Sequence, residues 1–152
     1  DKLKAKGVSV AEVTLHVGPG TFQNISVEDF REHQMHGEFY ELTEENAQII
    51  NRVKQKKGRI ITVGTTSTRV IETIASEDGV LTAQKGVTHA FIYPGYKYKA
   101  VDGLLTNFHW PKSSLILLVA ALYGRENTLA AYAEAVQNKL KLFSYGDGML
   151  IL

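Results

Sequence analysis

The chain has 152 residues, a net charge of +1, 44% hydrophobic and 22% charged residues, and no cysteine. This balance is ordinary for one globular domain with its own core, and the lack of cysteine excludes disulfides, thiolate zinc sites and thiol nucleophiles. Residues 1–11 lack the apolar stretch of a secretory signal. The longest apolar run, Leu115–Leu122, is far too short to cross a bilayer and predicts a buried helix.

In chain order, the first half predicts a strand over Val8–Val17, a turn at 18–21, a helix from Thr43 to Gly58, a short buried strand over Arg59–Val63, and a helix after the polar loop 64–67. The second half predicts a strand at Phe91–Tyr93, a hairpin whose first arm is Tyr96–Val101, a helix over Leu115–Tyr123 capped by Ser113 or Ser114, and a last helix over Thr128–Leu140. Strands alternate with helices, so the predicted class is α/β, with a mixed or mostly parallel sheet and helices on its faces.

Two segments early in the chain are candidates for chemistry. In the turn Gly18-Pro19-Gly20-Thr21, two glycines let backbone N–H groups approach a ligand closely, although a plain tight turn gives the same pattern. Residues 33–38 place two imidazoles and a carboxylate close together, which suits proton transfer or a metal as well as ordinary packing. The spacing does not match the helical zinc motif, in which two histidines stand four residues apart around a glutamate.

A third candidate is the loop 64–67 with Arg69 behind it. Free N–H groups at the start of a helix attract anions, whereas an arginine near the same end opposes the helix dipole. We therefore expect Arg69 and the loop to hold one anion together, so that Arg69→Ala weakens ligand binding and leaves the melting temperature nearly unchanged. The alternative is an arginine that packs over the surface.

Two further candidates lie in the second half. Residues 105–114 gather an amide, an imidazole, a lysine, two aromatic rings and two hydroxyls just before a buried helix, a mixture suited to bases and phosphates. Asp147 stands between two glycines in an apolar tail, where it is either a turn residue or a functional carboxylate.

Taken in order, five blocks resemble the signature sequences of one family: TLHVGPGTF (14–22), HQMHGEFYEL (33–42), VGTTSTRVIE (63–72), residues 91–124, and LFSYGDGMLI (142–151). They are similar to the S-adenosylmethionine:tRNA ribosyltransferase-isomerases of queuosine biosynthesis, and the resemblance covers nearly the whole chain. It implies an α/β fold that carries an inserted β-barrel domain. Residues 1–152 then form the C-terminal part of the α/β catalytic domain, a fragment that lacks the N-terminal part and the barrel.

The resemblance also implies a reaction. The ribosyl part of S-adenosylmethionine is transferred onto 7-aminomethyl-7-deazaguanine in tRNA and isomerised, which gives epoxyqueuosine and releases adenine and methionine. S-adenosylmethionine is then a substrate, the tRNA is the partner, and neither a metal nor a prosthetic group is expected. The implied location is cytoplasmic, away from membranes. As a fragment, the chain is expected to be inactive alone and to self-associate.

Such a reaction needs a base beside the sulfonium and an acid that helps adenine to leave, and the titratable candidates are His33, His36, Glu38, His109 and Asp147. The substrate-binding candidates are Gly18, Gly20 and Thr21 in the first loop, Thr65, Thr66, Ser67 and Arg69 for the methionine carboxylate, Phe108, Trp110 and Tyr145 as ring faces for a base, Asn107 as an amide edge, and Lys112.

Two other functions remain open from the sequence. One is a non-catalytic tRNA-binding or interaction fragment. The other is a metal hydrolase built on His33, His36 and Glu38.

Overall fold

A computed structural model of the protein describes residues 1–22 and 24–152, and for Pro19, Phe22 and Tyr145 it describes the backbone alone. The helices are α1 (Lys2–Ala5), α2 (Glu44–Gln55), α3 (Thr65–Ile74), α4 (Ser114–Tyr123) and α5 (Arg125–Gln137), with short 3-10 turns η1 (Pro19–Phe22), η2 (Phe30–Glu32) and η3 (Phe143–Tyr145). The strands are β1 (Thr14–Leu15), β2 (Glu38–Leu42), β3 (Ile61–Val63), β4 (Gln84–Thr88), β5 (Gly103–Asn107) and β6 (Gly148–Ile151).

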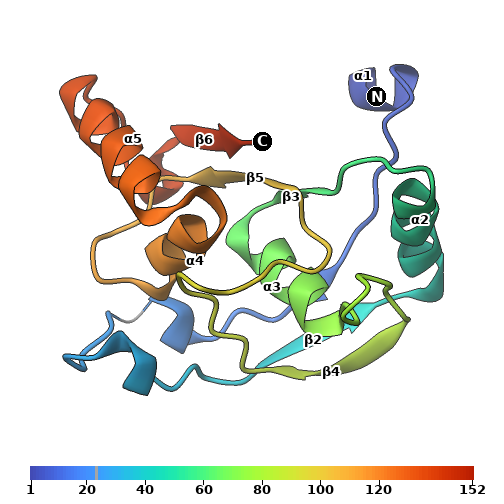
Figure 1. The fold of residues 1–152 in the computed structure, drawn as a ribbon, viewed down its shortest axis with the longest axis horizontal. Helices are drawn as coiled ribbons and strands as arrows, with labels where there is room; N and C mark the ends of the chain where they lie inside the picture. Colours follow the sequence, from blue (N-terminus) through green and yellow to red (C-terminus); the bar gives the residue numbers. More distant parts are fainter. Residues whose placement is uncertain (23) are drawn as a thin grey trace.

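The strands form two sheets of three (Figure 1). In the first sheet, β2 lies between β1 and β4, and both pairs are antiparallel. In the second sheet, β5 lies between β3, to which it is parallel, and β6, to which it is antiparallel. The α/β class is therefore confirmed, with the strands divided between two sheets rather than joined in one.

Helix α3 joins the two sheets, because it packs against strands of both. One side of the helix places Val70, Ile71 and Ile74 in a core shared with α2 and β2. At its first turns, the hydroxyl of Thr68 lies 2.7 Å from that of Thr62 on β3. A second core lies between α4 and the strands β5 and β6. Helix α3 thus fixes how the loops at the ends of both sheets meet.

Two helices begin where the sequence predicts. Thr43 caps α2 by accepting a hydrogen bond from the Asn46 N–H, and Ser113 caps α4 by accepting one from the Ile116 N–H. Helix α4 is apolar on all sides and largely buried, as expected. In the described part of the chain, no helix is long and apolar enough to span a membrane.

Several predicted strands are wrong. Within the segment Val8–Val17, only Thr14–Leu15 forms a strand, while Ala11 and Val13 pack partly buried against the first core. Residues 91–93 form no strand, although Ile92 is buried in the second core. The pattern also missed β4, whose sequence QKGVT contains few strand-forming residues.

The predicted hairpin at 96–101 is absent because a buried carboxylate holds that segment instead. Glu72 of α3 accepts hydrogen bonds from the N–H groups of Lys99, Ala100 and Val101 at 2.9–3.0 Å, and from the hydroxyl of Tyr96 at 3.0 Å. These bonds satisfy backbone donors that a hairpin would have paired with another strand. Strand β5, freed from the hairpin, pairs with β3 and β6.

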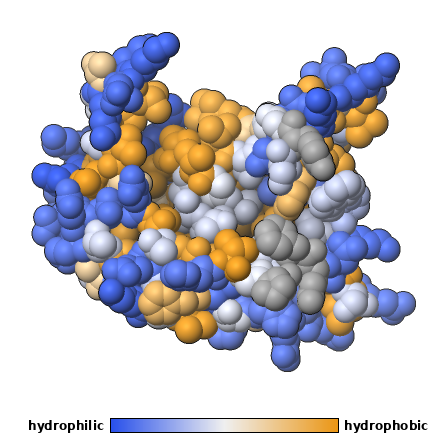
Figure 2. All heavy atoms as spheres, turned by 180° about the vertical axis from the view of Figure 1, so that it is seen from behind, coloured by the Kyte–Doolittle hydropathy of each residue, from blue (hydrophilic) through white to orange (hydrophobic). Residues whose placement is uncertain are grey.

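One face of the second sheet is apolar and uncovered. Alternation along β3, β5 and β6 directs Leu104 and Ile151 into the core and leaves the opposite side chains exposed. The exposed set is Ile61, Val63, Leu105 and Leu150, with Leu152 beyond the end of β6. Figure 2 shows hydrophobic surface gathered in the hollow between the N-terminal helix and α5, where this face lies. A contiguous apolar face of this kind favours association.

We expect the purified 152-residue chain to self-associate through this face. The change Val63→Lys with Leu150→Lys places charges on two strands of the face and should shift the chain towards monomer in sedimentation velocity at micromolar concentration. Val136→Lys is the matched control, since Val136 on α5 is also exposed, at 74%, but lies outside the face. A monomeric wild-type chain, or an equal effect of the control, would contradict this expectation.

Candidate functional site

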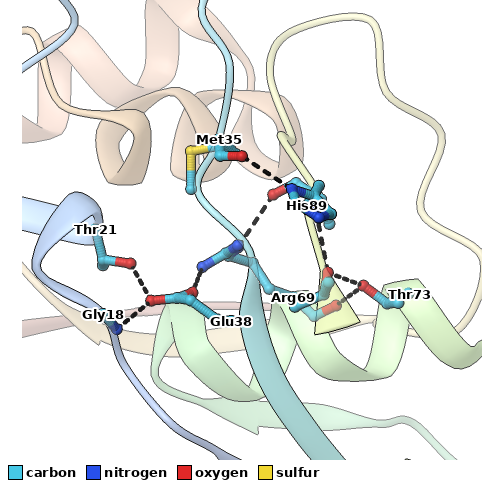
Figure 3. A network of polar contacts seen from close by, with 9 residues as sticks. Gly18, Thr21, Met35, Glu38, Arg69, Thr73 and His89 are labelled. Carbon is cyan, nitrogen blue, oxygen red and sulfur yellow. Dashed lines mark hydrogen bonds and ion pairs between the residues drawn. The ribbon is translucent and has the colours of Figure 1, made fainter. Parts of the chain in front are cut away.

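A buried carboxylate stands at the centre of the site. Glu38, the first residue of β2, is 2% exposed. One of its oxygens, Oε1, accepts hydrogen bonds from the Gly18 N–H at 2.9 Å and from the Thr21 hydroxyl at 2.5 Å. The other, Oε2, accepts one from Nη1 of Arg69 on α3. Figure 3 shows these side chains pointing toward one another from the first loop, β2 and α3.

The surroundings of Glu38 keep it ionised. Burial alone would raise the pKa of the Glu38 carboxyl, but the hydrogen bonds from Thr21, Gly18 and Arg69, with the Arg69 charge, hold that pKa below its usual range. A carboxylate with both oxygens occupied by donors is a poor proton acceptor. Glu38 is therefore suited to fixing the first loop rather than to acid or base chemistry.

Arg69 does not lie where the sequence suggested. Its guanidinium is buried, at 4% side-chain exposure, and it pairs with Glu38 while Nε donates to the Ala90 carbonyl at 3.1 Å. This burial contradicts the alternative of an arginine that packs over the surface. It also leads us to expect that Arg69→Ala lowers stability, because that change would bury an unpaired Glu38 charge. The remaining nitrogen, Nη2, is buried with no hydrogen-bond partner among the described residues, so an acceptor from a ligand or a water would satisfy it.

His36 lies over the first loop. Its ring occupies the space that a side chain at Gly20 would need, so that a Cβ there would overlap the imidazole. Glycine at this position is therefore required by close approach, and not by a left-handed backbone. The contact places the exposed imidazole of His36 over the first loop (residues 18–21, also called the glycine loop below).

The other histidine of this block points elsewhere. The ring of His33 packs edge-on against Phe91, with 5.2 Å between the ring centroids. In the described ranges 1–22 and 24–152, no group of three or more His, Asp or Glu side chains is placed to hold a metal ion. Since the Glu38 oxygens are already taken by Gly18, Thr21 and Arg69, this geometry gives the metal-hydrolase alternative no support.

The start of α3 has no side-chain cap. Its N-cap is Gly64, which offers no side chain to accept from the first N–H groups. Thr65 is buried, Thr66 is half-buried, and the Ser67 hydroxyl turns back to the Val63 carbonyl at 3.0 Å. The available donors at this end are therefore backbone N–H groups rather than the hydroxyl of Ser67.

The loop 107–112 divides into buried and exposed residues. Phe108 is buried and packs edge-on against Tyr132, so its ring is not available to a base. Trp110, in contrast, is 52% exposed, and Lys112 is exposed as well. Asn107 is exposed and donates to the Asp147 carbonyl at 3.2 Å.

His109 is enclosed rather than presented to a substrate. The ring nitrogen Nε2 lies 3.0 Å from the Thr106 hydroxyl, and the ring nitrogen Nδ1 is buried without a partner among the described residues. The backbone N–H of His109 donates to the Tyr132 hydroxyl. Burial lowers the pKa of His109 to about 4, because the imidazolium cannot be solvated there. His109 is therefore neutral at physiological pH.

Asp147 acts as a turn residue. Its carboxylate accepts a hydrogen bond from the Lys141 N–H at 2.6 Å, which closes the loop before β6. The side chain of Tyr145, the third proposed ring, lies outside what the structure describes.

The first loop and the loop before α4 are tied together. An antiparallel bridge joins Asn24 to Ser113, and the Ile25 N–H donates to the Lys112 carbonyl at 2.8 Å. Asn24 and Phe143, which border the small cavity at this junction, were not among the individual site residues predicted from the sequence. Hydrophobic periodicity could not identify Asn24 or Phe143, because both lie outside the α-helices and strands.

We expect Arg69→Met to lower the free energy of unfolding by about 3–5 kcal/mol, because it leaves the Glu38 charge buried and unpaired. Adding Glu38→Gln should recover part of this loss, since the amide oxygen can still accept from Gly18 and Thr21 without carrying a charge. Urea unfolding of the single and double variants measures both. A single variant within about 1 kcal/mol of wild type, or strictly additive effects, would show that the pair is not the central contact.

The His109 imidazole should make stability depend on pH. Its folded pKa of about 4 lies below the unfolded value of 6.5, so the unfolded chain binds more protons between these two values. Stability is full above about pH 6.5 and falls as the pH drops towards 4, by about 3 kcal/mol. The free-energy difference between wild type and His109→Gln, measured by urea unfolding, should shrink by that amount from pH 7 to pH 4. His16→Gln, at an exposed histidine, should run parallel to wild type; a parallel His109→Gln curve would refute the assignment.

Comparison with known proteins identifies a family and a similar solved structure. A family described as queuosine biosynthesis protein matches residues 1–151. The crystal structure of an S-adenosylmethionine tRNA ribosyltransferase from Thermotoga maritima superposes with a TM-score of 0.78 at 42% sequence identity, and the match covers 99% of this chain and 47% of that one. The chain thus spans about half the length of that protein. By the extent of the first match, the chain belongs to the queuosine biosynthesis protein family.

Proposed function

We propose that this chain forms part of the active site of an S-adenosylmethionine:tRNA ribosyltransferase-isomerase. The reaction transfers and isomerises the ribosyl part of S-adenosylmethionine onto 7-aminomethyl-7-deazaguanine in tRNA, with release of adenine and methionine. The substrates are S-adenosylmethionine and the tRNA that carries this base, in the cytoplasm. The chain contributes its loops as the C-terminal part of the catalytic domain, and the rest of the longer protein completes the site.

One observation carries the proposal. The buried Glu38 carboxylate holds together the first loop, β2 and α3, which belong to three of the sequence blocks that resemble this family. Loops at strand ends are where α/β proteins build their sites. The 42% identity with a ribosyltransferase over 99% of this chain supports the same conclusion.

The geometry favours His36 as the base. Of the five titratable candidates, Glu38 is occupied by donors, His109 is enclosed, Asp147 closes a turn, and His33 packs on a ring. His36 is exposed and lies directly over the glycine loop. We assign to its neutral imidazole the removal of the proton beside the sulfonium, a role that suits histidine near neutral pH.

The binding residues take narrower roles. Arg69 acts through Glu38 as a positioning residue, while the N–H groups at Thr65 and Thr66 receive the methionine carboxylate. Trp110 offers a ring face, and Lys112 offers a charge to the tRNA backbone. A non-catalytic tRNA-binding fragment would use the last two residues alone and would not need an imidazole on the glycine loop.

The test is adenine release by the longer protein that carries this sequence. With S-adenosylmethionine and precursor tRNA, His36→Gln should reduce the rate by about 10²–10⁴-fold, the usual contribution of a general base. His16→Gln, an exposed histidine on the neighbouring segment, is the matched control and should keep the rate. The 152-residue chain alone should release no adenine.

Adding the remaining part of the longer protein to the 152-residue chain should restore adenine release. Turnover by the monomeric chain alone would overturn the division of the site between the two parts. Full activity of His36→Gln would remove His36 from the mechanism, and no adenine release from the longer protein would remove the proposed function.

A further inference from the structure

We propose that the cavity between the first loop and the loop before α4 binds a single purine-type base, stacked against Trp110 and read at its edge by Asn24. The cavity has a volume of about 140 Å³ and is lined by Thr21, Asn24, Trp110, Ser113, Leu115 and Phe143. The identity of the base rests on the proposed function, whereas the site itself rests on the geometry below.

The size and charge of the cavity select the class of ligand. Whole drug-sized ligands occupy clefts of roughly 300–1,000 Å³, so this cavity takes a fragment the size of one base. Among the described residues that line it, none carries a charge, which disfavours a carboxylate or a phosphate. Two aromatic rings and Leu115 form the walls, and flat heteroaromatic rings are the ligands that such walls bind.

The backbone of Phe143, one of the two aromatic residues that line the cavity, is fixed by a hydrogen bond and has an unusual conformation. Phe143 adopts a left-handed backbone with φ of 60°, which is rare for a large residue, and its N–H donates to the Phe108 carbonyl at 2.7 Å. Lys112, next to the lining residue Ser113, also has a positive φ, of 59°. Backbone strain of this kind gathers at ligand-binding segments. Trp110, the other aromatic lining residue, is 52% exposed.

Asn24 supplies the group that reads the base. The bridge to Ser113 fixes its backbone, and its amide makes no hydrogen bond to any other residue within 1–22 and 24–152. A side-chain amide presents a donor and an acceptor side by side, which matches the adjacent donor and acceptor on the edge of a purine. Thr21 and Ser113 are less free, because each hydroxyl already donates, to Glu38 and to the Trp110 carbonyl respectively.

The cavity also lies next to the proposed reaction centre. Thr21 both lines the cavity and donates to Glu38, and Gly20 beside it carries the ring of His36. A base bound here would therefore hold its sugar near the glycine loop. Both the adenine of S-adenosylmethionine and the deazaguanine of the tRNA have the required chemistry, and the test separates them.

The single tryptophan of the chain gives a direct signal. The 152-residue chain is titrated with adenosine, with 7-deazaguanosine, and with cytidine and ribose as controls, while the fluorescence of Trp110 is followed. We expect saturable quenching by one purine-type nucleoside, with binding at least about fivefold tighter than for cytidine, and none by ribose. Preference for adenosine assigns the cavity to S-adenosylmethionine, and preference for 7-deazaguanosine assigns it to the tRNA.

Two variants test the assigned roles. Asn24→Ala should weaken binding at least about fivefold, the lower end of the effect of an amide that reads a base edge. Asn138→Ala is the matched control, at an exposed asparagine on the end of α5. Trp110→Leu should weaken binding by a similar factor when it is measured by calorimetry. Circular dichroism verifies that all variants fold.

The binding experiments can fail without the proposed function failing, and the reverse is also true. Unsaturable quenching, equal quenching by cytidine, or an unaltered Asn24→Ala variant would overturn the base site. Adenine release by the longer protein with an unchanged KM for both substrates in Asn24→Ala would also overturn it and leave the proposed function standing. Saturable purine binding by the 152-residue chain, together with no adenine release by the longer protein, would leave the base site standing and remove the proposed function.

Discussion

The ion pair between Glu38 and Arg69 is the contact on which the arrangement of the site depends. It joins β2, the middle strand of the first sheet, to helix α3. It also fastens the first loop through the N–H of Gly18 and the hydroxyl of Thr21. A buried ion pair is weak evidence for stability, because desolvation offsets most of the attraction. We infer that its effect is specificity, because Gly18 and Thr21 reach the same carboxylate oxygen from the loop while Arg69 reaches the other from α3.

Helix α3 carries that constraint to both sheets. From the same helix, Arg69 reaches β2, Thr68 reaches β3, and Glu72 gathers the N–H groups of 99–101. Arg69 and Glu72 are buried polar groups whose partners lie far away in the sequence, so each fixes a long-range relation that apolar packing alone would leave loose. The uncovered apolar face of β3, β5 and β6 has no such polar anchor among the described residues, which is consistent with a surface that packs against another body.

The sequence predicted elements whose causes are local. The caps Thr43 and Ser113 and the apolar run of α4 lie within a few residues of the structure that they specify. The sequence failed where a distant partner decides the outcome. The alternation at 96–101 suggested a hairpin, but Glu72, more than twenty residues earlier, takes up the backbone donors. Likewise, an arginine in the second turn of a helix suggested an anion site, and the anion proved to be Glu38 of the same chain.

The candidate site shows the same limit at the level of single residues. The composition of residues 105–114 indicated a functional loop. It could not show that Phe108 is buried while Trp110 is exposed, because composition does not say which side of a loop a side chain faces. It gave equal weight to two histidines three residues apart, whereas burial and contacts separate them: His33 packs on Phe91, and His36 covers the glycine loop. Burial therefore reduces a list of five titratable groups to one that is exposed beside the loop. Catalytic groups must reach solvent or substrate, and groups that hold the scaffold need not. Glu38 is of the second kind, because its carboxylate fastens the loop that the His36 ring covers.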